Sequence, residues 1–145
     1  MANLSCIPKY VKKEITDGWT GEVWYLMLLN NSFTPNPATQ HYVSDVVAYE
    51  ITDSGTPGAY KAGGILMNGL SSNADGNNYF LYAQDVSIGP NSSIDYRYGA
   101  FYTTTGGTGQ STYKLRAIID FLTDQVVNNG TSLIQWNALG IIYLT

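Results

Sequence analysis

The residues of this chain that could support catalysis are one histidine and several carboxylates. His41 is the only histidine among 145 residues, so three histidines cannot hold a metal, and a pairing of His41 with Asp45 is an ordinary surface arrangement. Asp45 with Glu50, or Asp120 with Asp124, could form the acid–base pair of a glycosidase. Asp120, however, is predicted on the outward face of a strand and Asp124 at a turn, where carboxylates are solvated. The sequence therefore predicts no catalytic residues and no enzyme.

Two glycine- and asparagine-rich stretches match ligand-binding loops only in part. The run GGTGQST (106–112) lacks the Gly-Lys-Ser/Thr ending of a phosphate loop, and the residues after it alternate as in a strand, where that motif needs a helix. The run NADGNN (73–78) has alternating oxygen-bearing residues but lacks the distant glutamate of a calcium loop. Its Asp-Gly step favours a hairpin turn. We therefore predict no cofactor and no metal.

Charge and cysteine content exclude further classes of function. The formal net charge is −4, and of the seven basic residues only Lys9, Lys12 and Lys13 cluster, which predicts no nucleic-acid partner because phosphate binding needs a basic stripe. The single cysteine, Cys6, excludes an internal disulfide and a cysteine metal cluster. The longest apolar run, 23–29, is too short to cross a bilayer. Without a secretory signal at its start, we expect a protein made in a cytoplasm, with no membrane partner.

The pattern of residues predicts the elements that would position any site. Charged residues make up only 12% of the chain, while Tyr and Gly number 12 and 15, a composition that favours strands and turns. Residues 23–29 are apolar on both alternating faces, as in a strand covered on both sides. We predict a mainly β fold: an antiparallel β-sandwich or barrel of about seven or eight short strands, with at most one or two short helices.

Several local expectations accompany this fold. Short helices are predicted at 8–16, ended by Asp17-Gly18, and within 40–51. Residues 71–78 read as a polar turn, and Gly89–Asn91 and Asn128–Gly130 as turns between strands. In residues 114–121, the alternation places Leu115, Ala117, Ile119 and Phe121 inward. The apolar closing stretch 132–145 predicts a terminal hairpin that returns at Gly140. Residues 1–22 form an N-terminal segment, a candidate docking arm, and 23–145 a single β-sandwich domain.

An ordered set of short motifs resembles small structural proteins of tailed bacteriophage virions. The motifs are an apolar strand followed by an Asn-Ser and Pro loop (23–37), VSDV (43–46), YKAGG (60–64), AFYTTTG (100–106), IDF (119–121) and QWNALG (135–140). The likeness covers about residues 23–145 in the same order throughout. It does not extend to the N-terminal segment up to Gly21 or to the loop at 52–58.

The resemblance implies a virion structural protein, and we expect a capsid decoration, or cement, protein on the outer head shell. Its partner would be the major capsid protein, and a homo-oligomer, with a trimer favoured, would suit a threefold position. A tail-associated adaptor, fibre or baseplate component is the alternative. A carbohydrate-binding β-sandwich that uses exposed Trp19, Trp24 or tyrosines is a further alternative.

Two parts of the N-terminal half are expected to make the protein contacts. Both carry apolar or neutral residues in segments that read as loop or arm rather than as core. The expected contact residues are Ile7, Pro8, Tyr10 and Val11 in the N-terminal segment, Phe33, Thr34, Pro35, Asn36 and Pro37 in the Pro-rich loop, and Tyr42.

Overall fold

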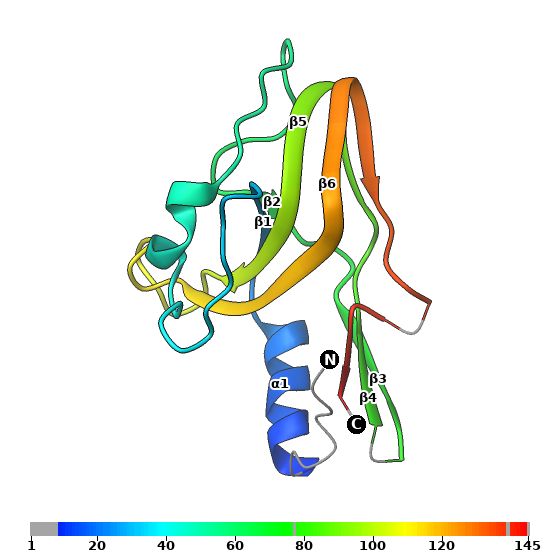
Figure 1. Cartoon of the computed structure of the whole chain (residues 1–145). Helices are drawn as coiled ribbons and strands as arrows, with labels where there is room; N and C mark the ends of the chain where they lie inside the picture. The colour runs from blue at the N-terminus through cyan, green and yellow to red at the C-terminus, as the bar shows by residue number, and fades with distance from the viewer. Residues whose placement is uncertain (1–8, 77, 139, 145) are drawn as a thin grey trace.

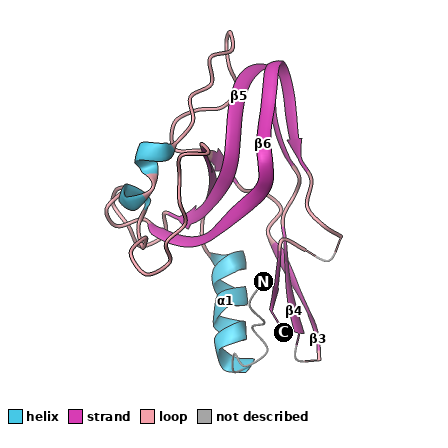
Figure 2. Cartoon of the chain, in the orientation of Figure 1, coloured by secondary structure: helices cyan, strands magenta, loops and turns pink. Residues whose placement is uncertain are grey.

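The computed structural model of the chain describes residues 9–76, 78–138 and 140–144. Strands hold 47% of the residues and helix 12%, which confirms the mainly β fold (Figure 2). In chain order the elements are helix α1 (Lys9–Gly21), strand β1 (Trp24–Leu29), the 3-10 helices η1 (Val43–Asp45) and η2 (Val47–Tyr49), and strands β2 (Ile65–Leu66), β3 (Ser71–Asp75), β4 (Asn78–Tyr82), β5 (Val86–Thr103), β6 (Lys114–Ile134) and β7 (Ile142–Leu144).

The strands form two antiparallel sheets. A four-stranded sheet has the order β2-β1-β5-β6, and a three-stranded sheet has the order β3-β4-β7. Neither sheet closes on itself, so the barrel alternative is not adopted. Figure 1 shows the four-stranded sheet curving through the centre, with α1 and the three-stranded sheet below it. Strand β6 is an outer strand of its sheet, and a bridge between Lys114 and Tyr42 covers the beginning of its outer edge.

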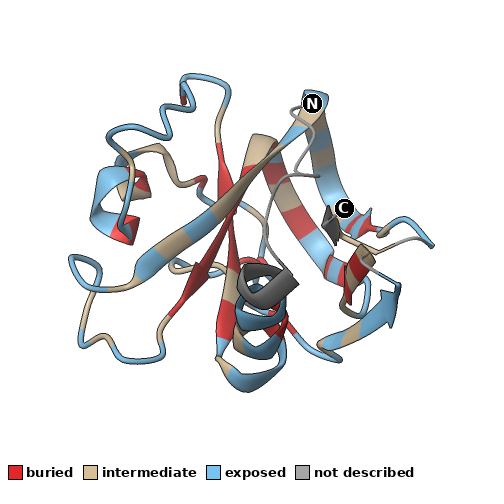
Figure 3. Cartoon of the chain, turned by 90° about the horizontal axis from the view of Figure 1, so that it is seen from below, coloured by how far each residue is buried: buried red, intermediate tan, exposed pale blue. Residues whose placement is uncertain are grey.

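Strand β1 is covered on both faces, as its two apolar faces predict. Trp24, Leu26 and Leu28 belong to a first core, between the four-stranded sheet, α1 and the three-stranded sheet. Met27 and Leu29 belong to a second core on the opposite face. In Figure 3 the buried residues accordingly follow the central strands, while the surrounding loops are exposed.

The second core is closed by the segment between β1 and β2. Phe33, Val43 and Val46 of this segment are buried against the sheet. The short helix expected within 40–51 forms as the two 3-10 turns η1 and η2. The segment thus takes the place of a second layer on this face, with few regular elements of its own.

Helix α1 continues beyond the Asp17-Gly18 step that was expected to end it. The reason is Trp19, which is fully buried. Its Nε1–H donates a hydrogen bond of 2.8 Å to the Tyr82 carbonyl of β4, and its ring meets the Trp24 ring at 4.7 Å. Burial of a tryptophan outweighs the cost of about 1 kcal/mol that a glycine adds inside a helix, so the helix extends to Gly21.

Strands β5 and β6 form one long bent hairpin where separate short strands were expected. The predicted turns at Gly89–Asn91 and Asn128–Gly130 are bulges inside continuous strands. Asn91 and Asn129 adopt φ of 64° and 48° there, a conformation that asparagine tolerates. Because the bulges lie close together on paired strands, both strands bend at the same place. Beyond the bend the two strands pair again, from Ile88 with Ser132 to Val86 with Ile134. Val86 therefore turns back toward the first core.

A further bulge divides the predicted inward face of β6. Ala117, Ile119 and Phe121 pack against the first core as expected, but Leu115 packs against the second. The pairing register shifts between Phe101 and Tyr102 of β5. One inserted residue reverses the side on which all later side chains lie, so simple alternation fails across it.

The three-stranded sheet corrects two predictions. The stretch 71–78 is not only a turn: β3 pairs with β4 on either side of Gly76, which has φ of 60°. The closing stretch is not a hairpin with the end of β6, because β7 pairs with β4. Gly140 does return the chain, with φ of 95°, and the Ile141 N–H donates to the Leu81 carbonyl at 2.7 Å.

Candidate protein-contact surface

The carboxylates and the histidine considered for catalysis hold the fold locally. The Asp45 carboxylate accepts hydrogen bonds from the backbone N–H groups of Tyr42 and His41 at 2.9 and 2.8 Å, and these two bonds lower its pKa. Asp120 pairs with Arg97. Within residues 9–76, 78–138 and 140–144, no three His, Cys, Asp or Glu side chains gather as a metal site would require. The same part of the chain has no helix of the length and apolarity that a membrane span needs.

The Pro-rich loop has one buried residue and an exposed tip. Phe33 is only 2% exposed, and its ring meets those of Tyr49 and Tyr98 edge-on at 5.5 and 5.4 Å. Phe33 therefore anchors the loop in the second core and is not a surface residue of the single chain. The exposed tip consists of Thr34, Pro35, Asn36 and Pro37.

Hydrogen bonds inside the loop fix this tip. The Asn36 side-chain oxygen accepts from the Ala38 N–H at 3.1 Å, and the Asn36 N–H donates to the Gln40 side chain at 2.7 Å. Gln40 in turn donates through Nε2 to the Thr34 carbonyl at 3.0 Å. Prolines at 35 and 37 restrict the backbone further. The loop is thus held in shape, which lowers the entropy cost of binding a partner.

The chain just after the loop is joined to the beginning of β6. The Leu115 N–H donates to the His41 carbonyl at 2.9 Å, and the Val43 N–H donates to the Tyr113 carbonyl at 3.1 Å. Tyr42 lies between these two bonds, and its side chain is 42% exposed. The Pro-rich loop and Tyr42 therefore lie together at the β6 edge, so the structure brings these predicted contact residues to one place.

The N-terminal contact residues are not placed in this way. Ile7 and Pro8 lie outside the described residues, and Tyr10 and Val11 belong to α1. Their role in contacts stays a prediction.

A groove runs between the Pro-rich loop and β6. Its volume is about 460 Å³. One wall is the loop together with His41, and the other wall is the first part of β6, from Leu115 to Ile118. The lining residues are Pro35, Asn36, Pro37, Gln40, His41, Leu115, Arg116, Ala117 and Ile118. We call this feature the loop–β6 groove.

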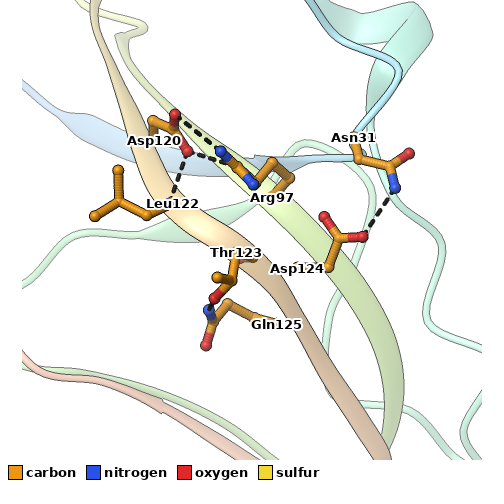
Figure 4. Close-up of polar contacts among 7 residues, drawn as sticks. All are labelled: Asn31, Arg97, Asp120, Leu122, Thr123, Asp124 and Gln125. Atoms are coloured by element: carbon orange, nitrogen blue, oxygen red, sulfur yellow. Dashed lines mark hydrogen bonds and ion pairs between the residues drawn. The ribbon is translucent and has the colours of Figure 1, made fainter.

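A leucine projects from β6 a few residues beyond the groove. Leu122 is 75% exposed and adopts φ of 71°, a left-handed conformation that costs a non-glycine residue about 1–2 kcal/mol. It lies in an irregularity of the ladder between Tyr96 and Tyr98, where β6 carries extra residues. Figure 4 shows its side chain pointing away from the polar contacts around it. Val126, farther along β6, is 59% exposed.

Polar contacts hold this part of β6 in place (Figure 4). The Asp120 carboxylate accepts from Arg97 Nε at 2.6 Å and from the Leu122 N–H at 2.7 Å, and the bond from Arg97, followed by that from Leu122, lowers the pKa of Asp120. Asp124 accepts from the Asn31 side chain at 2.9 Å. The strained backbone of Leu122 is thus supported on both sides, and strain held by surrounding contacts is a common sign of a functional position.

Little in the sequence indicates that Leu122 is exposed and has a strained backbone. The one available signal is that the alternation of 114–121 stops after Phe121, where the run continues as LTDQVV. A positive φ at leucine has no sequence signature, because local sterics disfavour it. Only the geometry of the β5–β6 hairpin reveals it.

The aromatic residues suggested for sugar binding include two that are inaccessible. Trp19 is fully buried and Trp24 is 4% exposed, so neither offers a platform to a sugar ring. A separate polar pocket of about 580 Å³ lies beside the bend of the β5–β6 hairpin. It is lined by Asn30, Asn31, Glu50, Ile51, Thr52, Ser54, Ser93, Ile94, Asp95, Val126 and Asn128.

Comparison with models of known protein families, with curated proteins and with solved structures yields no match.

Proposed function

We propose that this chain is a non-enzymatic structural protein of a tailed-bacteriophage virion. Within that class we propose a capsid decoration, or cement, protein that binds the outer head shell and bridges major capsid subunits. The ordered motifs of residues 23–145 support the class. A shell that contains packed DNA is under internal pressure, and a clamp that adds buried interface across subunit seams would resist it.

The observation that carries the proposal is the fixed, exposed tip of the Pro-rich loop. Thr34, Pro35, Asn36 and Pro37 are exposed and uncharged, and the bonds of Asn36 and Gln40 hold them in one shape. A preformed neutral loop suits a contact that is repeated many times over a symmetric shell, since each copy loses little conformational entropy on docking.

The location can be tested by counting copies of this chain in intact particles by quantitative mass spectrometry, and by locating its density in an electron-microscopy map. A head protein is expected on the order of hundreds of copies, as shell symmetry repeats each site, and a tail component on the order of ten. Density on the tail, with a low copy number, would instead support the adaptor, fibre or baseplate alternative. Absence from the particle would refute both.

The contact residues can be tested by adding purified protein to particles that lack it. Thr34→Arg and Pro37→Arg place a bulky charge on the exposed loop and should reduce binding. The matched control is Ala74→Arg, because Ala74 is exposed on β3 in the other sheet. Equal binding by all three variants would contradict the loop contact.

A carbohydrate-binding role is the alternative outside the virion class. The polar pocket near Asn31 and Asp95 is the feature that could serve it, since amides, carboxylates and hydroxyls hydrogen-bond to sugar hydroxyls. A glycan-binding screen of the isolated chain distinguishes the two functions: saturable binding that is lost in Asp95→Ala would favour the sugar module.

A further inference from the structure

Two asparagines of this chain, Asn68 and Asn129, are followed directly by glycine. In such a pair the backbone nitrogen of the glycine can attack the side-chain carbonyl carbon of the asparagine, because glycine has no side chain to hinder the approach. The reaction requires an accessible asparagine, a glycine N–H that no other group holds, and a backbone that can rotate to close the ring. The structure gives the two pairs very different surroundings.

Asn68 and Gly69 lie in the open connection between β2 and β3. Both residues are exposed, and neither belongs to a strand. Within the described residues, the Gly69 N–H meets no hydrogen-bond acceptor. The Asn68 Nδ2 donates to the Leu66 carbonyl only at 3.5 Å, which is at the long limit for a hydrogen bond. The attacking nitrogen and the side-chain amide are therefore both available.

Asn129 and Gly130 lie inside β6, at the bend of the β5–β6 hairpin. The Asn129 N–H donates to Ser93 Oγ at 2.9 Å, and Gly130 pairs with Ser92 of β5. Asn129 also has φ of 48° as part of the bulge. Ring closure at this pair would first have to open part of the hairpin, so the folded structure protects it.

We propose that Asn68 is a site of spontaneous deamidation in the folded protein and that Asn129 is protected from it. The Gly69 nitrogen forms a bond to Asn68 Cγ and loses its proton, and the side-chain amide nitrogen leaves with a proton as ammonia. Water then opens the five-membered imide at one of its two carbonyl carbons. The products are aspartate, with the original main chain, and isoaspartate, in which the main chain runs through the former side chain.

The conformation of the β2–β3 connection favours glycine at position 69 and so maintains the reactive pair. Gly69 has φ of 62°, in the left-handed region that other residues rarely adopt. A Cβ on Gly69 would lie 2.5 Å from Gln84 Cγ, so a side chain there would also collide with the connection between β4 and β5. The susceptibility of Asn68 thus follows from the shape of the chain at this point.

Isoaspartate at position 68 would alter a junction between the two sheets. The Met67 N–H donates to the Trp24 carbonyl of β1, and the Gln84 N–H donates to the Asn68 carbonyl, both at 2.9 Å. Isoaspartate inserts one carbon atom into the main chain between Met67 and Gly69 and moves the Asn68 carbonyl out of the main chain. Since Met67 is buried in the first core, the longer chain displaces the Gln84 contact. We expect the Tm to fall by about 4 °C, as for the loss of one hydrogen bond.

Incubation of the full chain at mildly alkaline pH tests the proposal, because the attacking nitrogen must lose its proton. Trypsin places the two sites in separate peptides, 62–97 and 117–145, and mass spectrometry with fragmentation follows the conversion of amide to acid at each residue. Asn68 should react about ten-fold faster than Asn129 or more, since reaction at Asn129 must break about two hydrogen bonds of ordinary strength. No reaction at Asn68, or equal rates at the two sites, would overturn the proposal.

Denaturant separates the effect of the fold from that of the local sequence. Both sites are Asn-Gly pairs, so their rates should become nearly equal in the unfolded chain. If the difference persisted in denaturant, the fold would not be what selects Asn68, and the proposal would be wrong.

Two variants separate the effect of isoaspartate from that of the added charge. Asn68→Ser cannot form the imide, so its Tm should stay constant during the incubation. Freshly prepared Asn68→Asp carries the new charge on an unchanged main chain and should keep a Tm close to that of the fresh natural chain. A loss of Tm in Asn68→Ser as large as that of the natural chain would show that the change lies elsewhere. The inference does not depend on the virion assignment.

Discussion

At the scale of single residues, Asp53 organises the loop between η2 and β2. Its carboxylate accepts four backbone hydrogen bonds, from Gly55 at 2.9 Å, Ala59 at 2.9 Å, Tyr60 at 3.0 Å and Ser93 at 2.8 Å. The first three bonds close the loop on itself, and the fourth ties it to β5. Hydrogen bonds to this one side chain thus hold a segment that has no regular backbone pairing of its own.

These bonds predict a pH dependence of stability. Burial by itself raises the pKa of Asp53, but the bonds from Ser93, Tyr60 and Gly55 outweigh it and hold the pKa far below its ordinary value. The stabilisation is therefore complete above the unfolded-state pKa of about 4 and is lost as the pH falls toward the folded-state value. Asp53→Asn should reduce the unfolding free energy at pH 7 by on the order of 1 kcal/mol, allowing for partial exposure.

Denaturant unfolding at several pH values measures this effect. The loss of stability between about pH 4 and pH 2 should be shallower in Asp53→Asn than in the natural chain. Identical slopes would mean that Asp53 does not carry the stabilisation. Asp95→Asn is a suitable control, because Asp95 is exposed on β5.

Tyr60 is the second residue on which this region depends. Its hydroxyl accepts from the Leu28 N–H at 2.9 Å and donates to Glu50 at 2.9 Å, and burial raises its pKa well above the ordinary value. Tyr60→Phe would leave the buried Leu28 N–H without this acceptor, at a cost of about 1–3 kcal/mol. Thermal unfolding should show the loss, and Tyr42→Phe, at an exposed tyrosine, should change the Tm little.

At the scale of elements, α1 is attached to the domain chiefly through Trp19. The side chain is fully buried and bonded to β4. Trp19→Ala should cost about 3–5 kcal/mol, as for other large core truncations. Trp19→Phe keeps most of the volume but loses the Nε1–H bond, and it should cost less. If unfolding in denaturant gives equal free energies for both variants, the hydrogen bond rather than the packing holds the helix.

The closing strand makes a different prediction. β7 pairs with β4 through Tyr79, Phe80 and Leu81, so it completes the three-stranded sheet. Protein that lacks residues 139–145 should lose this strand and fail to fold, because a two-stranded ribbon is marginal in water. Circular dichroism and solubility measure the outcome. A soluble, folded truncation would contradict the prediction.

At the scale of the whole molecule, the proposed clamp should affect the particle more than the chain. Heads without this protein should release DNA at a lower temperature than complete heads, since buried interface across the seams is missing. Dye fluorescence on released DNA measures that temperature. Adding back purified protein should restore it, whereas Pro37→Arg protein should not. Equal release temperatures with and without the bound protein would show that the protein does not stabilise the head.

The sequence by itself determined the fold class and the character of individual strands. The two apolar faces of 23–29 predicted a doubly covered strand, and β1 has cores on both sides. The Pro and Asn residues of 33–37 predicted a loop, which the structure contains. These features depend on local backbone sterics and on the alternation of apolar side chains along a strand. Both can be read from residues that are close together in the sequence.

Tertiary structure alone decided which strands join and which residues reach the surface. Phe33 is buried because two aromatic rings from elsewhere in the chain receive it, and Leu115 changes sides because of one bulge. Leu122 is exposed in a strained conformation because the surrounding contacts support it. Such outcomes follow from packing between residues that are far apart in the sequence. The free energy of this packing exceeds local conformational preferences, and a short stretch of sequence does not reveal which distant residues will pack against it.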